Sequence, residues 1–185
     1  RDGLVTGVQT CALPISPVLL MEGAIGERLK REFNITMDPT LVMANLVYQP
    51  EARQALRSIY MEYVGIAERY GLPFLATTPT RRANKERVGR SQYAETLFEE
   101  NVRFLKEIRE MSTVRMYVGG LMGCKGDAYK ATGALSVAES WAFHSWEAGH
   151  FKAAGADFLF AGIMPTLPEA IGMAMAMEET GLPYI

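Results

Sequence analysis

The feature of this sequence that most constrains its fold is a regular alternation of short apolar runs with longer helical segments. The apolar runs cover residues 18–21, 73–77, 114–121, 158–164 and 183–185. Between them lie segments with helical periodicity or helix caps, at 24–33, 51–70, 92–111, 136–154 and 166–180. Strands that alternate with helices of ten or more residues form parallel βαβ units. The pattern therefore predicts an α/β fold with four βα units and the start of a fifth strand.

Two local signals predict where helices begin. Asp38 is followed by Pro39, and because Asp is a favoured N-cap and Pro a favoured first helical residue, another helix is expected to start there. Ser136 is followed three residues later by Glu139. This spacing is a capping box, which predicts the start of the helix at 136–154.

Two architectures fit this order of elements: an open doubly wound sheet and part of a TIM (β/α)8 barrel. Both bury their strands on two faces, as the nearly continuous apolar runs require. A closed barrel takes roughly 250 residues, so a chain of 185 residues is too short to close one. Residues 22–26 read Glu-Gly-Ala-Ile-Gly, which is not the G-x-G-x-x-G of a dinucleotide fold, and the sequence has no Walker A motif.

Composition excludes several classes of protein. The hydrophobic fraction of 49% and the net charge of −2 are those of a globular protein with no general attraction to nucleic acid or anionic membranes. The two cysteines, Cys11 and Cys124, form no CxxC pair, so a reducing compartment is expected and local cysteines cannot build a zinc site. No apolar run approaches the ~18 residues of a membrane span. We expect a cytoplasmic protein.

Residues 1–16 differ from the rest of the chain. They read RDGLVTGVQTCALPIS and show no amphipathic period. This string resembles translated sequencing-adapter read-through, and we interpret it as a non-native scar; the alternative is a natural N-terminal arm. Residues 17–185 then form the one predicted domain.

Ligands bind at the carboxyl ends of the strands in both architectures. Glu22 and Gly23 follow the first predicted strand. A carboxylate at this position can hold an amine or act as a base, although a loop acid or a helix-capping group would look the same in sequence. Residues 78–84, 119–127 and 162–166 follow the next three strands.

A basic segment follows the second strand. Arg81 and Arg82 come first, and arginines at a strand end can bind carboxylate or phosphate in a bidentate manner. Lys85, Arg87 and Arg90 are better explained as a solvated helix flank.

Cys124 follows the third strand and is a candidate nucleophile only if a histidine lies beside it. His144 and His150 lie on a helix outside the predicted sheet. We therefore interpret Cys124 as a small loop residue and both histidines as surface residues.

Four motifs, in order along the chain, resemble those of one known family. They are Leu19–Gly26, the Thr78-x-Thr80-x-x-Ala83-Asn84 run, Val118–Gly123 with Gly126–Tyr129, and Ala153–Asp157 with Pro165, Glu169 and Ala170. Each motif alone is weak, but the set is similar to the homocysteine S-methyltransferase family over residues 18–185. The resemblance favours the barrel over the doubly wound sheet, and the chain is then its N-terminal half. An unrelated α/β domain with chance matches is the remaining alternative.

The resemblance implies a methyl transfer from a donor to the thiol of homocysteine, giving methionine, with zinc holding the thiolate. The family's zinc-ligating cysteines follow strands six and eight, so they are expected beyond Ile185, and this chain alone should bind no zinc and be inactive. No catalytic residue is then assigned within it. Small molecules are the only partners implied. The substrate-binding residues implied by the match are Glu22, Gly23, Thr78, Thr80, Arg81, Arg82, Asn84 and Gly120.

The chain departs from the family pattern at three places. Glu22 stands where the family has aspartate, Arg81 where it has an aromatic residue, and Gly162-Ile163 where it has Glu-Thr. A carboxylate is lost from the mouth of the barrel and arginines are gained. We therefore expect an altered, more acidic substrate, and a non-catalytic binding protein on the same barrel is the alternative function. A half-barrel also leaves two open sheet edges, so self-association is expected.

Overall fold

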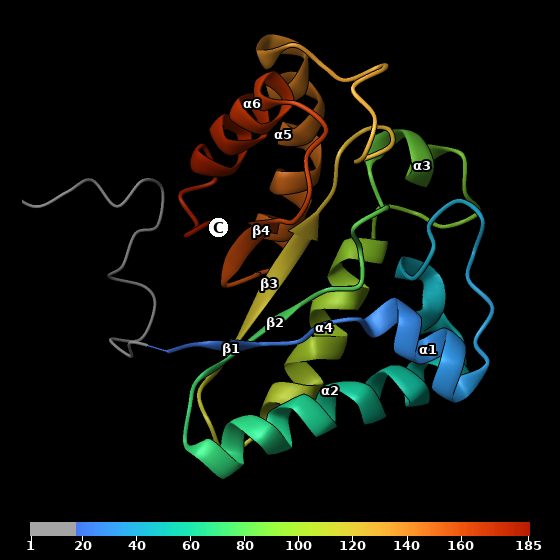
Figure 1. The fold of residues 1–185 in the computed structure, drawn as a ribbon, viewed down its shortest axis with the longest axis vertical. Helices are drawn as coiled ribbons and strands as arrows, with labels where there is room; N and C mark the ends of the chain where they lie inside the picture. Colours follow the sequence, from blue (N-terminus) through green and yellow to red (C-terminus); the bar gives the residue numbers. More distant parts are fainter. Residues whose placement is uncertain (1–17) are drawn as a thin grey trace, which may run out of the picture.

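The structure is a computed structural model that describes residues 18–185. The predicted scar at 1–16, including Cys11, lies outside the described residues. Four parallel strands form one sheet, β1 (Leu20–Met21), β2 (Phe74–Thr77), β3 (Met116–Met122) and β4 (Phe158–Ala161). They lie side by side in chain order (Figure 1). Each strand is joined to the next by helices, as the alternating pattern predicts.

A fifth strand begins beside β4. Tyr184 forms a parallel bridge with Leu159. The Leu159 amide donates to the carbonyl of Pro183 at 2.9 Å, and the Ile185 amide donates to the carbonyl of Leu159 at 3.0 Å. The predicted start of strand five is therefore confirmed as a continuation of the same parallel sheet.

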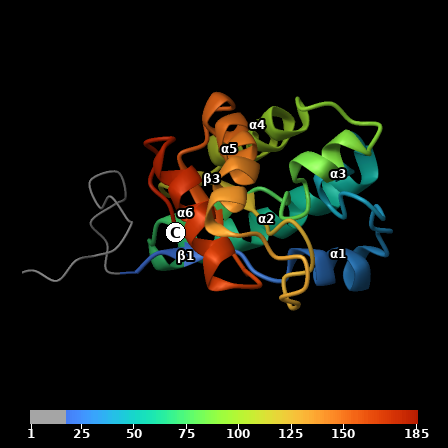
Figure 2. The same ribbon diagram turned by 90° about the horizontal axis from the view of Figure 1, so that it is seen from above.

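The helices lie between the strands in sequence. They are α1 (Ile25–Phe33), the 3₁₀ helix η1 (Ala44–Tyr48), α2 (Pro50–Tyr70), α3 (Lys85–Gly89), α4 (Leu97–Glu110), α5 (Val137–Ala153) and α6 (Leu167–Glu178). The predicted capping box is present at the start of α5, where Ser136 and Glu139 bond each other's backbone amides. Helices α5 and α6 pack against each other, and α1 and α3 lie to the right of both in Figure 2.

The helix expected to start at Asp38 is not an α-helix. The Asp38 carboxylate does accept the amides of Thr40 and Leu41, at 2.8 and 2.7 Å, as an N-cap would. However, Val42 adopts a φ of 63°, and its amide and carbonyl both bond back to Asp38. The left-handed residue stops the turn from continuing as an α-helix, and only the 3₁₀ helix η1 follows.

Two other boundaries were predicted too wide. Helix α4 starts at Leu97 rather than at residue 92, and β4 ends at Ala161 rather than at residue 164. Residues 92–96 belong to the connection between α3 and α4, and residues 162–164 to the loop after β4, so the error places loop residues inside regular elements.

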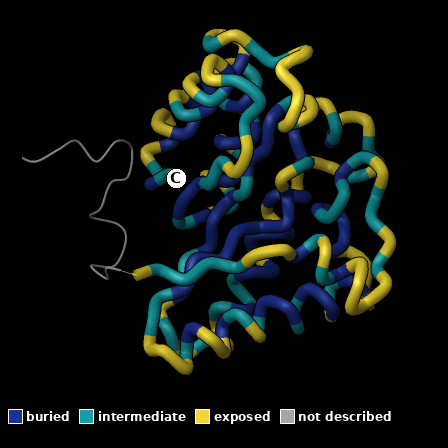
Figure 3. The backbone as a smooth tube through the Cα atoms, viewed as in Figure 1, coloured by how far each residue is buried: buried dark blue, intermediate teal, exposed yellow. Residues whose placement is uncertain are grey.

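The core lies between the sheet and the helices, and β2 and β3 are its most buried strands (Figure 3). Alternate strand residues point to the same face, and one such set joins the core cluster with the helices: Phe74, Ala76, Met116, Val118 and Leu159. No helix within residues 18–185 is long and apolar enough to span a membrane.

Candidate functional site

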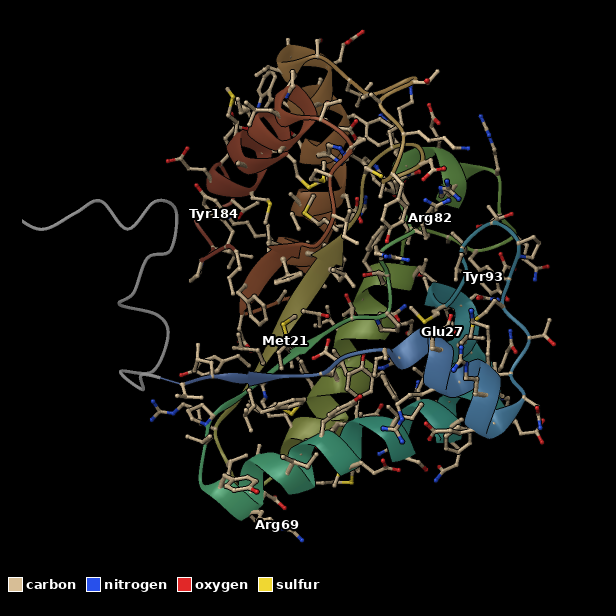
Figure 4. All side chains as sticks on the ribbon, in the orientation of Figure 1. Met21, Glu27, Arg69, Arg82, Tyr93 and Tyr184 are labelled. Atoms are coloured by element: carbon tan, nitrogen blue, oxygen red, sulfur yellow. The ribbon has the colours of Figure 1, made fainter. Side chains whose placement is uncertain are left out.

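The carboxyl ends of the four parallel strands meet at one edge of the sheet. Glu22 follows β1, and the segment 78–84 follows β2. The long loop 123–136 follows β3 and is largely exposed (Figure 3). Arg82 lies where α3 meets this loop, far from Tyr184 in the fifth strand (Figure 4). Most of the side chains expected at the mouth therefore gather at this edge.

Glu22 reaches across from β1 to the end of β2. The Thr77 amide donates to its Oε1 at 2.9 Å, and the Thr77 hydroxyl donates to the same oxygen. The other oxygen, Oε2, is buried and has no hydrogen-bond partner among the described residues. Burial raises the pKa of Glu22 from its ordinary 4.5 to about 7, against the opposing effect of the Thr77 bonds. The structure thus presents one unpaired carboxylate oxygen beside the strand ends.

Thr78 and Thr80 are fully buried, and their hydroxyls form hydrogen bonds with the backbone of β3. The Leu121 amide donates to Thr78 Oγ1 at 3.1 Å, and the Thr80 hydroxyl donates to the Leu121 carbonyl at 2.8 Å. The two hydroxyl oxygens lie 2.6 Å apart, so Thr78 donates to Thr80. These bonds extend the β2–β3 pairing beyond the end of β2, and they occupy hydroxyls that were expected to face substrate.

Asn84 joins the β2 loop to the β3 loop. Its side-chain oxygen accepts the Arg87 amide at 3.1 Å and caps α3, while its side-chain nitrogen donates to the carbonyls of Cys124 and Lys125 at 3.4 and 3.1 Å. At Gly123, a Cβ would lie only 1.9 Å from the Arg81 carbonyl oxygen. A side chain cannot fit there, so the close approach of the two loops requires glycine.

Gly120 and Gly23 are placed differently from the rest of the predicted set. A Cβ on Gly120 would lie 2.4 Å from the ring of Phe151 in α5, so this glycine lets a helix pack closely on β3. Gly23 is exposed, and its carbonyl accepts the Tyr63 hydroxyl at 2.6 Å. The structure does not bring Gly120 to the mouth, and contact of either glycine with a ligand stays a prediction.

The two arginines after β2 line a pocket. It holds about 330 Å³ of empty space, part of it open to solvent. The pocket lies between the loops that follow β2, β3 and β4, and it is lined by Arg81, Arg82, Gly123, Cys124, Asp127, Ala128, Tyr129 and Ile163. Cys124 is buried, and burial raises the pKa of its thiol. The pocket therefore offers guanidinium groups and a neutral thiol.

The rest of the basic segment is not simply a solvated flank. Arg87 is half-buried, and its side chain donates to the Thr40 carbonyl at 3.2 Å. Burial lowers its pKa. Lys85 and Arg90 are exposed, as expected.

Sequence reasoning missed a buried polar cluster on α5 and α6. His144 was expected at the surface but is fully buried, with its Nε2 3.5 Å from Glu169 Oε1. Glu169 accepts the amides of Lys125 and Leu135, at 2.9 and 3.1 Å, so it holds both ends of the loop that follows β3. Burial lowers the pKa of His144. The one sequence signal for this cluster was that Glu169 belongs to the last of the four motifs. The motif gave no indication of the groups with which Glu169 forms hydrogen bonds.

No group of three or more His, Cys, Asp or Glu residues that could hold a metal ion exists within residues 18–185. Cys124 has no second sulfur beside it in this part of the chain, since Cys11 lies outside the described residues. The described residues therefore do not fit a zinc centre, and no step of a reaction is assigned to a metal held by them.

Comparison with known proteins places these features in context. The family model for homocysteine S-methyltransferase matches residues 19–185. Three solved forms of the homocysteine methyltransferase MmuM from Escherichia coli are similar. The metallated form is 20% identical with a TM-score of 0.72, the oxidized form 21% with 0.74, and the apo form 20% with 0.60. A search of the curated proteins finds no match.

The alignments cover 90, 92 and 95% of this chain but only 61, 61 and 63% of the MmuM chain, in the same order. At this level of identity the likeness establishes the fold, which is part of a TIM barrel. This chain therefore spans less than two thirds of the length of the structures that it matches.

Proposed function

The chain belongs to the homocysteine S-methyltransferase family, and from this premise we propose that the complete protein transfers a methyl group to the thiol of homocysteine or a related thiol. With homocysteine the product is methionine. The observation that carries the proposal is the family match over residues 19–185 together with a free carboxylate oxygen on Glu22 at the strand ends.

Glu22 is proposed to hold the ammonium group of the amino-acid substrate. Its Oε1 is fixed by Thr77, which leaves Oε2 as the acceptor. A cation near a buried carboxylate favours the ionised form. Substrate binding is therefore expected to lower the raised pKa of Glu22 and to form a charge-assisted hydrogen bond.

The remaining part of the chemistry is assigned to residues outside this chain. Methyl transfer needs the thiol as thiolate, and a bound zinc ion would supply that form near neutral pH. Because residues 18–185 offer no metal site, we propose that the zinc ligands lie beyond Ile185. A metal analysis of the complete protein tests this, with about one zinc per chain as the expected result.

The activity is tested by incubating the complete protein with homocysteine and methyl donors of different charge, S-methylmethionine and betaine among them. Methionine should form with at least one donor. Glu22→Ala should raise the KM for homocysteine about tenfold or more, since it removes the ammonium acceptor. Homocysteine binding without methyl transfer from any donor would instead support the non-catalytic alternative.

A further inference from the structure

The pocket beside Cys124 carries an unbalanced positive charge. Within residues 18–185, no carboxylate lies within ion-pair distance of Arg81 or Arg82, whereas other arginines in the structure, such as Arg53, are paired. Arg82 donates one hydrogen bond, from Nη1 to the Gly126 carbonyl at 2.8 Å. The remaining guanidinium N–H groups at the pocket have no protein acceptor in the described chain.

The one acid that lines the pocket is already engaged. Asp127 Oδ1 accepts the Tyr129 amide at 3.0 Å, and its Oδ2 lies 3.5 Å from the Lys130 ammonium. The Tyr129 amide, together with the charges of Lys130 and Arg82, holds the pKa of Asp127 below its ordinary value, so this acid offsets part of the charge of Arg82 and not that of Arg81. Asp127 therefore stays charged but is bound to its own loop.

The backbone beneath the arginines is held in place. Gly123 lies against the Arg81 carbonyl, and the Asn84 amide bonds both Cys124 and Lys125. Glu169 bonds the Lys125 amide on the other side of the loop. These bonds fix the position of the backbone from which both arginine side chains extend into the pocket.

We propose that this pocket is an anion subsite in which Arg81 binds a carboxylate of the thiol substrate, so that the protein prefers thiols with an additional carboxylate. A planar guanidinium with free N–H groups matches a carboxylate in bidentate geometry. The inference rests on the proposed function only for the identity of the thiol.

The test is a calorimetric titration of the complete protein with three thiols that differ in carboxylate number. These are mercaptosuccinate with two, 3-mercaptopropionate with one and 2-mercaptoethanol with none, and since all three lack an ammonium group, Glu22 does not distinguish between them. We expect affinity to follow the number of carboxylates. Arg81→Ala should weaken mercaptosuccinate binding about tenfold and leave 2-mercaptoethanol binding unchanged. Arg81→Lys keeps the charge but loses the fork of N–H groups. It should weaken mercaptosuccinate binding, but by less than Arg81→Ala does.

Arg90→Ala is the matched control, because Arg90 is exposed on the same segment but does not line the pocket. It should bind all three thiols as the unchanged protein does. Equal binding of mercaptosuccinate and 2-mercaptoethanol, no binding of mercaptosuccinate, or equal losses in Arg81→Ala and Arg90→Ala would each overturn the subsite. The titration measures binding without turnover. If the protein makes methionine but shows no carboxylate-dependent binding, the subsite is refuted and the proposed function is not. Carboxylate-dependent binding without methyl transfer refutes only the proposed function.

Discussion

Glu22 illustrates at the scale of a single residue how burial and hydrogen bonding oppose each other. Two bonds from Thr77 favour the carboxylate form, but removal from water favours the neutral form and is the larger effect. The pKa of about 7 means that Glu22 changes its charge near neutral pH. Its ability to hold a cation is then strongest above that pH.

Glu22 should make stability depend on pH. Its pKa is raised from 4.5 in the unfolded chain to about 7 in the folded chain, so the folded state binds the extra proton between these values. The free energy of unfolding should therefore fall as pH rises from 4.5 to 7, by up to about 3 kcal/mol. Glu22→Gln keeps an acceptor for Thr77 and should remove this slope. Urea unfolding of both proteins at pH 5, 6, 7 and 8 measures it, and parallel curves for the two would refute the prediction.

Glu147 is a second buried acid, and it has no compensating bond. It is 1% exposed on α5, and both of its carboxylate oxygens lack a partner among the described residues. Burial raises its pKa well above the ordinary value. Glu147→Met should therefore raise the free energy of unfolding by about 1–3 kcal/mol, because it removes a buried polar group that forms no hydrogen bond.

The matched control for Glu147→Met is Glu178→Met, since Glu178 is exposed at the end of α6. This change should shift the free energy of unfolding by less than about 0.5 kcal/mol. Guanidinium unfolding at pH 7 measures both variants. A loss of stability in Glu147→Met would show that its carboxyl group has a structural partner.

The sequence predicted which residues follow the strands but not the state of their side chains. Glu22, Thr78 and Asn84 lie after the ends of β1 and β2, and their contact with a ligand stays a prediction. Position in the sequence could not reveal that the Thr78 hydroxyl bonds β3 and the Asn84 amide bonds the loop after β3, because those partners are backbone groups 43 and 40 residues away. Backbone partners leave no residue-type signal in a single sequence.

At the scale of elements, the close pairing of α5 and α6 depends on one glycine. A Cβ on Gly172 would lie 2.3 Å from the Val137 carbonyl oxygen and 2.5 Å from Ser140 Cβ. Gly172→Ala must therefore push the helices apart, and we expect a loss of about 1–3 kcal/mol in the free energy of unfolding. Gly149→Ala is the control, since a Cβ there meets nothing within 4 Å.

Gly149→Ala should raise stability by about 0.5–1 kcal/mol, because alanine is the better helix former. Thermal unfolding measured by circular dichroism compares the two variants, which carry the same substitution in neighbouring helices. Opposite shifts in Tm are expected. Shifts of the same sign would mean that helix propensity, not the close approach at Gly172, controls the pairing.

Element boundaries show why periodicity succeeds in some segments and fails in others. Helix α2 was predicted almost to the residue, because it has a long apolar stripe and ends at Gly71, whose φ is 61°. The segment after Asp38 has a helix cap but contains Val42 in a left-handed conformation. A β-branched residue is an unexpected choice for that conformation, so no sequence rule would have placed the break there.

At the scale of the whole molecule, the sheet is parallel and runs in chain order from β1 to the strand that begins at Pro183. The alternating pattern predicted parallel strands but fitted two architectures, and the resemblance to the family favoured the barrel, in which each crossover adds the next strand beside the last. Within residues 18–185, no strand pairs with the outer side of β1 or of the fifth strand. These two sides are the open edges that the sequence predicted.

Open parallel edges should make the 185-residue chain self-associate, and Tyr184 offers a way to test the fifth-strand edge. The Pro183 carbonyl and the Ile185 amide bond β4, so the Tyr184 amide points to the opposite side of the strand. Tyr184→Pro removes that outward donor and keeps both bonds to β4. Tyr184→Ala also loses the aromatic ring but keeps the donor.

Light scattering over a range of concentrations should show assemblies larger than dimers for the unchanged chain and for Tyr184→Ala. Tyr184→Pro should form dimers at most, through the β1 edge that remains. A monodisperse monomer for the unchanged chain, or equal association of both variants, would show that these edges do not drive assembly.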